Sequence, residues 1–317
     1  MKGVMKLILS AAVLNTLLLC AACGNQSDAG TNAGEIQGEQ EIQIQADVMD
    51  EIVITEETMT LTKDQLYYRC MNTLEYLDQL SGSVSTLYGN TTPHIFEGEF
   101  DFDFANDTYH AVVNAVNASD LSVSQINEYY NDGEDYVTLC DYSGEQEDVC
   151  LIESGSSCPT MENVVFANAC PENIAEASAE AVTSVEQLDE EQLHATYGAD
   201  PTGAHEIGTF FIPQEMSVGY LQNFDNWEIT GTQEVQGRTC AVVTGTANPE
   251  YGGRFGVETF EILVDQETGV WMQFEGYDAE GAVQSYVYTS DIAFGADAQP
   301  VPEFTEECAE GYVMETF

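Results

Sequence analysis

Nine cysteines are the residues of this 317-residue chain best suited to chemistry, because a thiol can be oxidised, acylated or bound to a metal. Cys20 and Cys23 stand three residues apart in the stretch LLLCAACGN. This Cys-x-x-Cys spacing is that of a redox pair. The two thiols end an apolar run, however, which lacks the electropositive surroundings of reactive cysteines. We therefore expect these two cysteines to serve export rather than redox chemistry.

The segment around these cysteines has the pattern of an export signal. Lys2 and Lys6 form a short cationic start, residues 7–19 form an apolar stretch, and small residues follow. The apolar stretch is shorter than the ~20 residues that a transmembrane helix needs. We therefore predict a signal peptide over residues 1–22 rather than a permanent membrane span.

The sequence Ala21-Ala22-Cys23-Gly24 resembles the lipobox of bacterial lipoproteins, with Cys23 as the acylated new N-terminus. The resemblance implies a lipid-anchored protein on the extracytoplasmic face of the bacterial cell membrane. Cys20 departs from the pattern, because lipoproteins usually carry Leu at that position. Ordinary signal cleavage without a lipid therefore stays open as the alternative.

Residues 23–58 are predicted to be a flexible acidic tether. They consist mainly of Gly, Asn, Gln, Asp and Glu, which cannot bury enough apolar surface to offset the entropy of ordering. A flexible coil of about 35 residues would hold the body on the order of 30 Å from its attachment point. Residues 59–317 are long enough for one large domain or two small ones.

The chain is strongly acidic, and this restricts its partners. Without the signal peptide it has four basic residues against 56 acidic residues, hence a formal charge of −52. Nucleic acid is excluded as a partner, because phosphate binding requires clustered Lys and Arg. Anionic lipid headgroups are repelled as well, so membrane contact depends on the acyl anchor alone. Because the carboxylates are spread along the chain, they favour a solvating surface over a cation site.

The remaining thiols predict neither a cofactor nor a metal site. Between Cys140 and Cys170 they are close enough for local disulfides in an oxidising compartment, but their pairing is not readable from the sequence. Zinc is disfavoured, because none of these cysteines has Cys-x2-Cys spacing and no two histidines have ligand-like spacing. Asp101, Asp103 and Asp107 lack the Gly and Glu of a calcium loop. No cofactor is expected.

The body begins with a predicted helix and continues as strands. Thr62 and Gln65 form a capping box, and apolar residues at helical spacing run to Leu80, which predicts a helix over residues 62–80. The stretch IFEGEFDFDF alternates apolar and acidic residues, which is typical of a half-buried strand. The sequence Asn131-Asp132-Gly133 predicts a tight hairpin turn.

The rest of the body predicts more strands. An insertion around residues 145–215 is expected to be Cys-rich, with two short polar helices over residues 171–182 and 185–198. From Trp227 onward, strands follow each other with hairpin turns and no βαβ rhythm. About ten strands behind one long helix predict a single α+β domain.

Two segments resemble the LolA and RseB/MucB-like superfamily. They are TKDQLYYRCMNTLEYLDQLSGS near the start of the body and NFDNWEITGTQEVQGRTCAVVTG with FEILVDQETGVWMQFEGYDAEGAVQSYVYTSDI near its end. The resemblance covers about residues 60–100 and 220–295, and its hairpin motifs are moderately specific. It implies a strongly curved antiparallel half-barrel with helices on its concave side, where several members hold acyl chains or lipidated partners. No ligand-binding residue of the family maps onto this chain position by position.

The sequence predicts a binding protein rather than an enzyme, because G-x-S-x-G, P-loop, H-E-x-x-H and Ser-x-x-Lys motifs are absent. The first hypothesis is a lipid or acyl ligand in the concave face of the half-barrel, under a lid helix that contributes Leu66, Leu74 and Leu77. The alternative is a regulatory or sensor lipoprotein that contacts another exported protein. A dry core is the competing explanation for the apolar strand residues. The proposed ligand lining consists of Phe100, Phe102, Phe104, Phe260, Ile262, Met272, Phe274, Tyr286 and Tyr288.

Overall fold

The computed structural model describes residues 61–88, 94–142, 148–154, 160–166, 182–187, 192–198 and 202–316. The chain divides into two compact units, Met1–Ile54 and Thr55–Phe317, and every described residue belongs to the second. The predicted signal peptide, the tether and the lipid-attachment residue Cys23 lie outside the described residues. So do Cys158 and Cys170.

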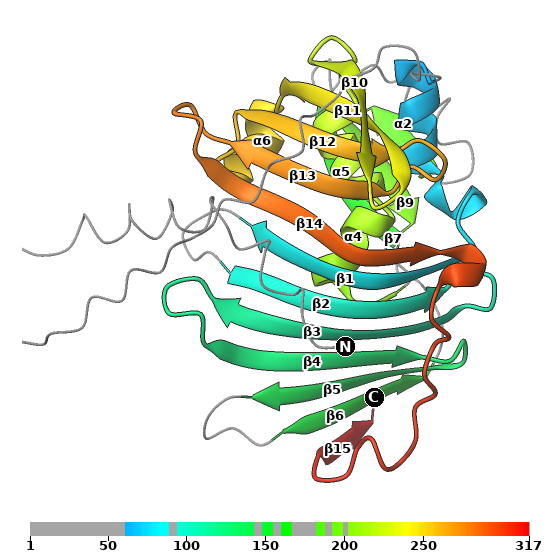
Figure 1. The fold of residues 1–317 in the computed structure, drawn as a ribbon. Coiled ribbons are helices and arrows are strands. Elements are labelled where there is room, and N and C mark those ends of the chain that lie inside the picture. Colours follow the sequence, from blue (N-terminus) through cyan, green and yellow to red (C-terminus); the bar gives the residue numbers. More distant parts are fainter. Residues whose placement is uncertain are drawn as a thin grey trace, which may run out of the picture. The chain divides into compact units, whose positions relative to one another are not determined.

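One large curved sheet dominates the described part of the chain (Figure 1). Its twelve strands lie in the order β10-β11-β12-β13-β14-β1-β2-β3-β4-β5-β6-β15, and a separate three-stranded sheet has the order β7-β9-β8. The strands are β1 (Gln79–Tyr88), β2 (His94–Asp103), β3 (Thr108–Asn117), β4 (Val123–Asn131), β5 (Asp135–Tyr142), β6 (Val149–Ser154), β7 (Thr160–Phe166), β8 (Val182–Gln187), β9 (Gln192–Gly198), β10 (Trp227–Val235), β11 (Arg238–Thr246), β12 (Thr259–Asp265), β13 (Trp271–Tyr277), β14 (Val283–Phe294) and β15 (Val313–Thr316). The predicted fold class, an α+β protein with a curved antiparallel sheet, is confirmed.

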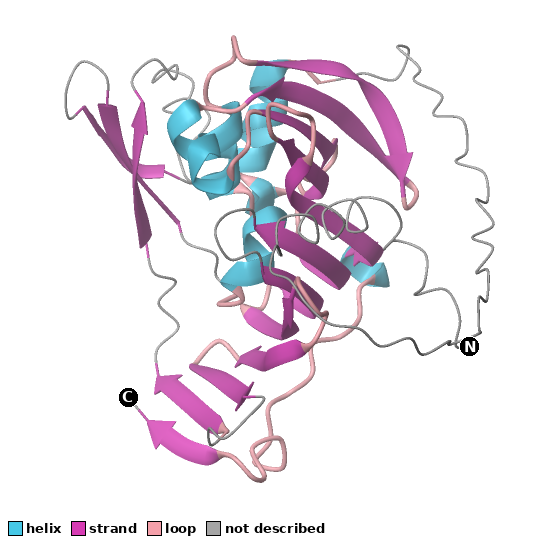
Figure 2. Cartoon of the chain, turned by 90° about the vertical axis from the view of Figure 1, so that its left-hand side faces the viewer, coloured by secondary structure: helices cyan, strands magenta, loops and turns pink. Residues whose placement is uncertain are grey.

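Short helices complete the fold, and most helical residues lie on one side of the large sheet (Figure 2). They are α2 (Lys63–Met71), η2 (Thr73–Glu75), α4 (His205–Phe211), α5 (Gln214–Leu221), α6 (Pro249–Phe255) and η3 (Gly295–Asp297). None of the described helices has the length and apolar character needed to cross a membrane.

The alternating strand pattern gives the large sheet two different faces. On β2, Phe100 and Phe102 are buried against the helices, whereas Asp101 and Asp103 are half-buried on the opposite face. The predicted hairpin between β4 and β5 is confirmed, and Gly133 has the positive φ of 88° that the turn requires.

The predicted helix over residues 62–80 is wrong in its second half. The capping box of Thr62 and Gln65 is confirmed, but α2 ends at Met71, where the side chain of Asn72 donates to the carbonyl of Tyr68. The chain enters β1 at Gln79. Strand β1 pairs with both β2 and β14, so its backbone groups are hydrogen-bonded on both sides. This pairing outweighs the local helical pattern.

The helix predicted over residues 185–198 is also wrong. Residues 182–187 form β8 and residues 192–198 form β9, and β9 pairs with both β7 and β8. Pairing on both sides of β9, including with the more distant β7, outweighs the local helical pattern. The helix predicted from Pro171 falls almost wholly outside the described residues.

The described cysteines are free thiols. Cys70, Cys140, Cys150 and Cys240 are buried, and Cys308 is half-buried. Cys140 and Cys150 lie on the neighbouring strands β5 and β6 without a bond between them. A disulfide between these two residues, which the sequence allowed, is therefore not formed.

Candidate functional site

The helices α4 and α5 cover the face of the sheet on which the predicted ligand lining lies. Helix α4 packs against β1, β2 and β13, and α5 packs against α4 and α2. A glycine allows α4 to approach closely, since a Cβ at Gly98 would stand 3.0 Å from two side-chain carbons of Ile207. The sheet and α4 are therefore in direct contact.

Aromatic rings fill the interface between the helices and the sheet. The ring of Phe211 on α4 lies 4.3 Å from that of Phe100, centroid to centroid, and Phe100 stacks on Phe102 at 4.9 Å. Tyr220 on α5 lies 5.2 Å from Phe260 and 5.0 Å from Phe274. Such pairs add to the stabilisation that burial alone provides. The covered face is an aromatic surface contributed by β2, β12 and β13.

Seven of the nine predicted lining residues lie on this helix-covered face. Phe104 is half-buried and packs against the main core, and the other six are almost fully buried. These six are Phe100, Phe102, Phe260, Ile262, Met272 and Phe274. The described structure therefore brings them together as one packed surface.

Tyr286 and Tyr288 lie on the opposite face of the sheet. Phe274 pairs with Val287, so Val287 faces the helices and its two tyrosine neighbours point the other way. The hydroxyl of Tyr286 lies 3.5 Å from that of Ser85, and the hydroxyl of Tyr288 donates to Glu275. Because successive residues of a strand alternate between faces, these tyrosines and the other seven residues do not line one surface.

The predicted lid is only partly in place. Leu66 on α2 and Leu77 beyond η2 are buried, but Leu74 is 44% exposed. Helix α4 packs directly on β1, β2 and β13, α5 contacts the sheet through Tyr220, and α2 packs against α5. Phe211 and Tyr220 were not predicted to contact this face, although the stretch IGTFFIPQEMSVGYL between residues 207 and 221 is apolar enough to indicate a buried helix pair.

The interface of α5 with its surroundings contains imperfectly bonded polar groups. Ser217 Oγ and Trp271 Nε1 are buried, and neither has a hydrogen-bond partner of ordinary geometry among the described residues. Both lie near the Cys70 thiol. Burial raises the pKa of this thiol to about 12, although hydrogen bonds with Trp271 and Ser217 act to lower it. A buried polar group with a weak hydrogen-bond partner such as a thiol costs free energy that a buried apolar group does not. The interface that holds α5 is therefore less stable than an interface made of apolar side chains alone.

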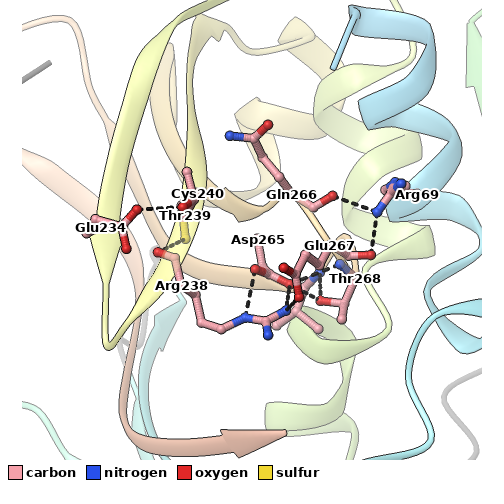
Figure 3. Close-up of polar contacts among 10 residues, drawn as sticks. Arg69, Glu234, Arg238, Thr239, Cys240, Asp265, Gln266, Glu267 and Thr268 are labelled. Atoms are coloured by element: carbon pink, nitrogen blue, oxygen red, sulfur yellow. Dashed lines mark hydrogen bonds and ion pairs between the residues drawn. The ribbon is translucent and has the colours of Figure 1, made fainter. Parts of the chain in front are cut away.

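In contrast, α2 is attached by strong polar contacts to the β12–β13 hairpin (Figure 3). The Arg69 guanidinium donates to the backbone carbonyls of Gln266 at 2.8 Å and Glu267 at 2.5 Å. Behind this turn, Asp265 is 1% exposed and accepts from Arg238 Nε at 3.0 Å and Nη2 at 2.7 Å. Charged hydrogen bonds of this kind are about twice as strong as neutral ones. Helix α2 is thus fixed to the sheet.

A titratable cluster lies on the face of the sheet opposite the helices. His110 Nε2 is 3.0 Å from Glu128 Oε1, and Nδ1 is 3.7 Å from Asp101 Oδ2. Burial opposes the charged imidazole, but the two carboxylates outweigh it and raise the pKa of His110 to about 9. The described residues contain no group of His, Cys, Asp and Glu arranged to hold a metal. The cluster is therefore a half-buried ion-pair network.

The raised pKa predicts a specific pH dependence of stability. The pKa of His110 is higher in the folded chain than its unfolded value of about 6.5. The resulting stabilisation is fully present below pH 6.5 and is lost as the pH rises through about 9. We expect the difference in unfolding free energy between the native chain and His110→Gln to shrink between pH 6.5 and pH 9. Urea unfolding of both proteins at several pH values measures it, and a constant difference would contradict the ion pair.

Comparisons with known proteins find distant structural similarity and no match to a protein family or a curated protein. No protein-family model matches the chain, and no curated protein is significantly similar to it. Similar solved structures include the Pseudomonas aeruginosa MucA/MucB complex, at 12% identity and a TM-score of 0.33, over 75% of this chain and 62% of that chain. LprF from Mycobacterium bovis has 11% identity and a TM-score of 0.37, over 76% and 96%.

A LolA superfamily protein from Nitrosomonas europaea has 7% identity and a TM-score of 0.22, over 78% of this chain and 97% of that chain. The chain thus spans less than two thirds of the MucB structure. Because these TM-scores are below 0.5, neither fold nor function is transferred from them, and the fold class rests on the strand order itself. The chain is similar, at this distance, to structures of the LolA and MucB group that its sequence resembles.

Proposed function

We propose that this chain is an exported, lipid-anchored binding protein that takes an apolar ligand, a lipid or an acyl chain, on the helix-covered face of its sheet. The anchor would be Cys23, as the lipobox resemblance implies. The ligand would contact Phe100, Phe102, Phe260 and Phe274, from which α4 and α5 must first withdraw. Apolar, aromatic-lined surfaces with few polar groups are typical of lipid sites.

The observation that carries this proposal is the contrast between a strong sheet and a weak cover. Helices α4 and α5 have seven and eight residues, and neither has a side-chain cap at its N-terminus. Helices this short depend on tertiary packing for their stability. Their packing includes the poorly bonded Ser217 hydroxyl, whereas the strands beneath are paired on both sides. The cover can therefore leave while the sheet persists.

The proposal predicts that pinning α4 to β2 abolishes ligand binding. Gly98→Cys combined with Ile207→Cys places two thiols where a Cβ at position 98 approaches the Ile207 side chain to 3.0 Å, a separation that a disulfide can bridge. We expect mass spectrometry to find stoichiometric lipid on the reduced double variant and at least tenfold less on the oxidised form. The same protein in its reduced state is the matched control.

Two results would contradict the proposal. One is equal lipid content in the oxidised and reduced forms, because the ligand would then bind elsewhere. The other is a native chain that carries no lipid after purification and binds no fluorescent fatty acid, because the aromatic face would then be a permanent dry core. The second result would return the partner-binding alternative as the first choice.

A further inference from the structure

The C-terminal segment runs over the face of the sheet opposite the helices. We define the C-terminal strap as residues 298–316, which follow η3 and end in β15 (Figure 1). Near its start, the backbone N–H of Gln299 donates to Ser81 Oγ on β1 at 2.9 Å. The ring of Phe304 lies 5.4 Å from that of Tyr130 on β4. The strap thus connects the middle of the sheet to its β6 edge.

Beneath the strap lies an apolar patch that is separate from the main core. We define the outer patch as Tyr130, Val137, Leu139 and Cys150, all buried on β4, β5 and β6. The half-buried strap residues Phe304, Cys308, Ala309 and Tyr312 pack against it. Tyr129, the neighbour of Tyr130, bonds Glu206 on α4, so the outer patch belongs to the opposite face. The sheet therefore has a second apolar surface.

The strap holds this patch with little secondary structure. Residues 298–312 form turns and bends but neither helix nor strand within this described stretch. Strand β15 pairs with β6 over four residues and is the parallel member of an otherwise antiparallel sheet among the described strands. Val313 and Met314 are 45% and 52% exposed. Without β15, the β6 edge would present unpaired backbone groups to another strand.

The strap also lies against charges of its own sign. It carries Glu303, Glu306, Glu307, Glu310 and Glu315 and no Lys or Arg. The sheet beneath is acidic too. Burial, followed by the negative charges of Asp141, Asp148 and Glu128, raises the pKa of Tyr312. Negative charges near one another repel, and dissolved salt weakens this repulsion. A segment with basic residues in place of these glutamates would therefore complement the acidic sheet better than the strap does.

We propose that the outer patch and the β6 edge form a docking site for an extended segment of an exported partner protein, which the strap occupies until the partner displaces it. The partner segment would add a strand to β6 and place an aromatic residue on Tyr130, as Phe304 does. It would carry basic residues where the strap has glutamates, because the surface is acidic. This site lies on the opposite face from the proposed ligand site and is independent of it.

The test releases the strap after folding. A protease recognition sequence inserted between the exposed residues Gln299 and Pro300 of the full chain allows the strap to be cut while the sheet is intact. The probes are two fluorescent peptides of residues 300–317, one native and one with Glu303, Glu306, Glu307 and Glu310 replaced by lysine. Both carry Cys308→Ser to prevent oxidation. Fluorescence anisotropy measures their binding before and after cleavage.

We expect both peptides to bind the cleaved chain, with the lysine peptide at least tenfold tighter at low salt, an advantage that shrinks in high salt. Uncleaved chain should bind either peptide at least tenfold more weakly, because its own strap competes. Phe304→Ala in the peptide should weaken binding at least tenfold without affecting the fold of the chain. Tyr130→Ala should do the same, whereas Tyr76→Ala, an exposed tyrosine elsewhere, should not.

Four outcomes would overturn the proposal. A cut strap that never exchanges with excess peptide would be a permanent part of the fold. Equal affinities of the native and lysine peptides at low salt would remove the charge argument. Binding that ignores both cleavage and the Phe304→Ala change would place the peptides elsewhere on the acidic surface. Circular dichroism of the cleaved chain shows whether the sheet has survived, and its loss would also refute a displaceable strap.

Discussion

Replacing Arg238 with methionine should destabilise the folded chain by about 3–5 kcal/mol, because it leaves the carboxylate of Asp265 buried without its positive partner. Asp265 is 1% exposed and accepts two hydrogen bonds from Arg238. The other groups that donate hydrogen bonds to this carboxylate are the N–H of Thr268 at 2.9 Å and the Thr268 hydroxyl at 2.5 Å, and both are neutral. They cannot compensate for a lost guanidinium.

Urea unfolding of Arg238→Met, Asp265→Asn and the double variant measures this effect. We expect the double variant to lose about 0.5–3 kcal/mol less unfolding free energy than the two single variants lose together, since the second change removes the unpaired charge. The control is Arg254→Met, at an exposed arginine on α6, which should change stability by about 0.5 kcal/mol or less. Strictly additive losses would show that Asp265 does not depend on Arg238.

The second large effect is expected from Gly269→Ala, which should separate α2 from the β12–β13 hairpin. Gly269 has a φ of +86°, and a Cβ there would lie 2.4 Å from the carbonyl oxygen of Arg69. The backbone conformation costs about 1–2 kcal/mol for a residue with a side chain. The forced shift adds about 1–3 kcal/mol. It also breaks the bonds of Arg69 to the hairpin carbonyls.

Two other glycines serve as controls that distinguish the cost of the backbone conformation from the cost of the steric clash. Gly237 and Gly281 both have a φ of +81°, and a Cβ at either would meet no atom within 4 Å. Alanine at these positions should therefore cost only the conformational term, about 1–2 kcal/mol. Unfolding free energies of the three variants, with hydrogen exchange of the α2 amides, measure the difference. If Gly269→Ala costs no more than Gly281→Ala, the hairpin does not press on α2 as described.

These two predictions concern the fixed part of the helical layer, and the ligand proposal concerns its movable part. Helix α2 uses cations that are scarce in this chain. Lys63 contacts the carbonyl of Phe224 at 2.8 Å and Glu228 at 2.9 Å, and Arg69 and Arg238 hold the hairpin. The contacts described for α4 with the sheet are mainly aromatic and aliphatic. Fixed charges therefore anchor the frame, and apolar contacts, which are less directional, hold the cover.

Strand alternation and turn chemistry were readable from the sequence because both are local. The period-2 pattern of Phe100 and Phe102 against Asp101 and Asp103 determines which side chains share a face. The turn at Gly133 requires a positive φ that glycine supplies. The capping box of Thr62 and Gln65 is likewise set within four residues. These features predicted the fold class and which apolar residues of β2 share a face.

The side occupied by Tyr286 and Tyr288 was not readable in the same way. Tyr286, Val287 and Tyr288 are all apolar enough to face a core, so either alternation fits the sequence. The pairing of Val287 with Phe274 decides it. A shift of one residue in this register would exchange the faces of all three side chains. Register between strands is a long-range property.

The same distinction explains the helices and the strap. The alternating strands such as β2, the hairpin turns, the acidic surface and the start of α2 could be predicted, because each depends on neighbours along the chain. Only the tertiary structure decided that α2 ends at Met71, that α4 and α5 cover the aromatic face, and that residues 298–316 cross the opposite face to β6. The physical reason is that backbone pairing and side-chain burial between distant segments outweigh local preferences.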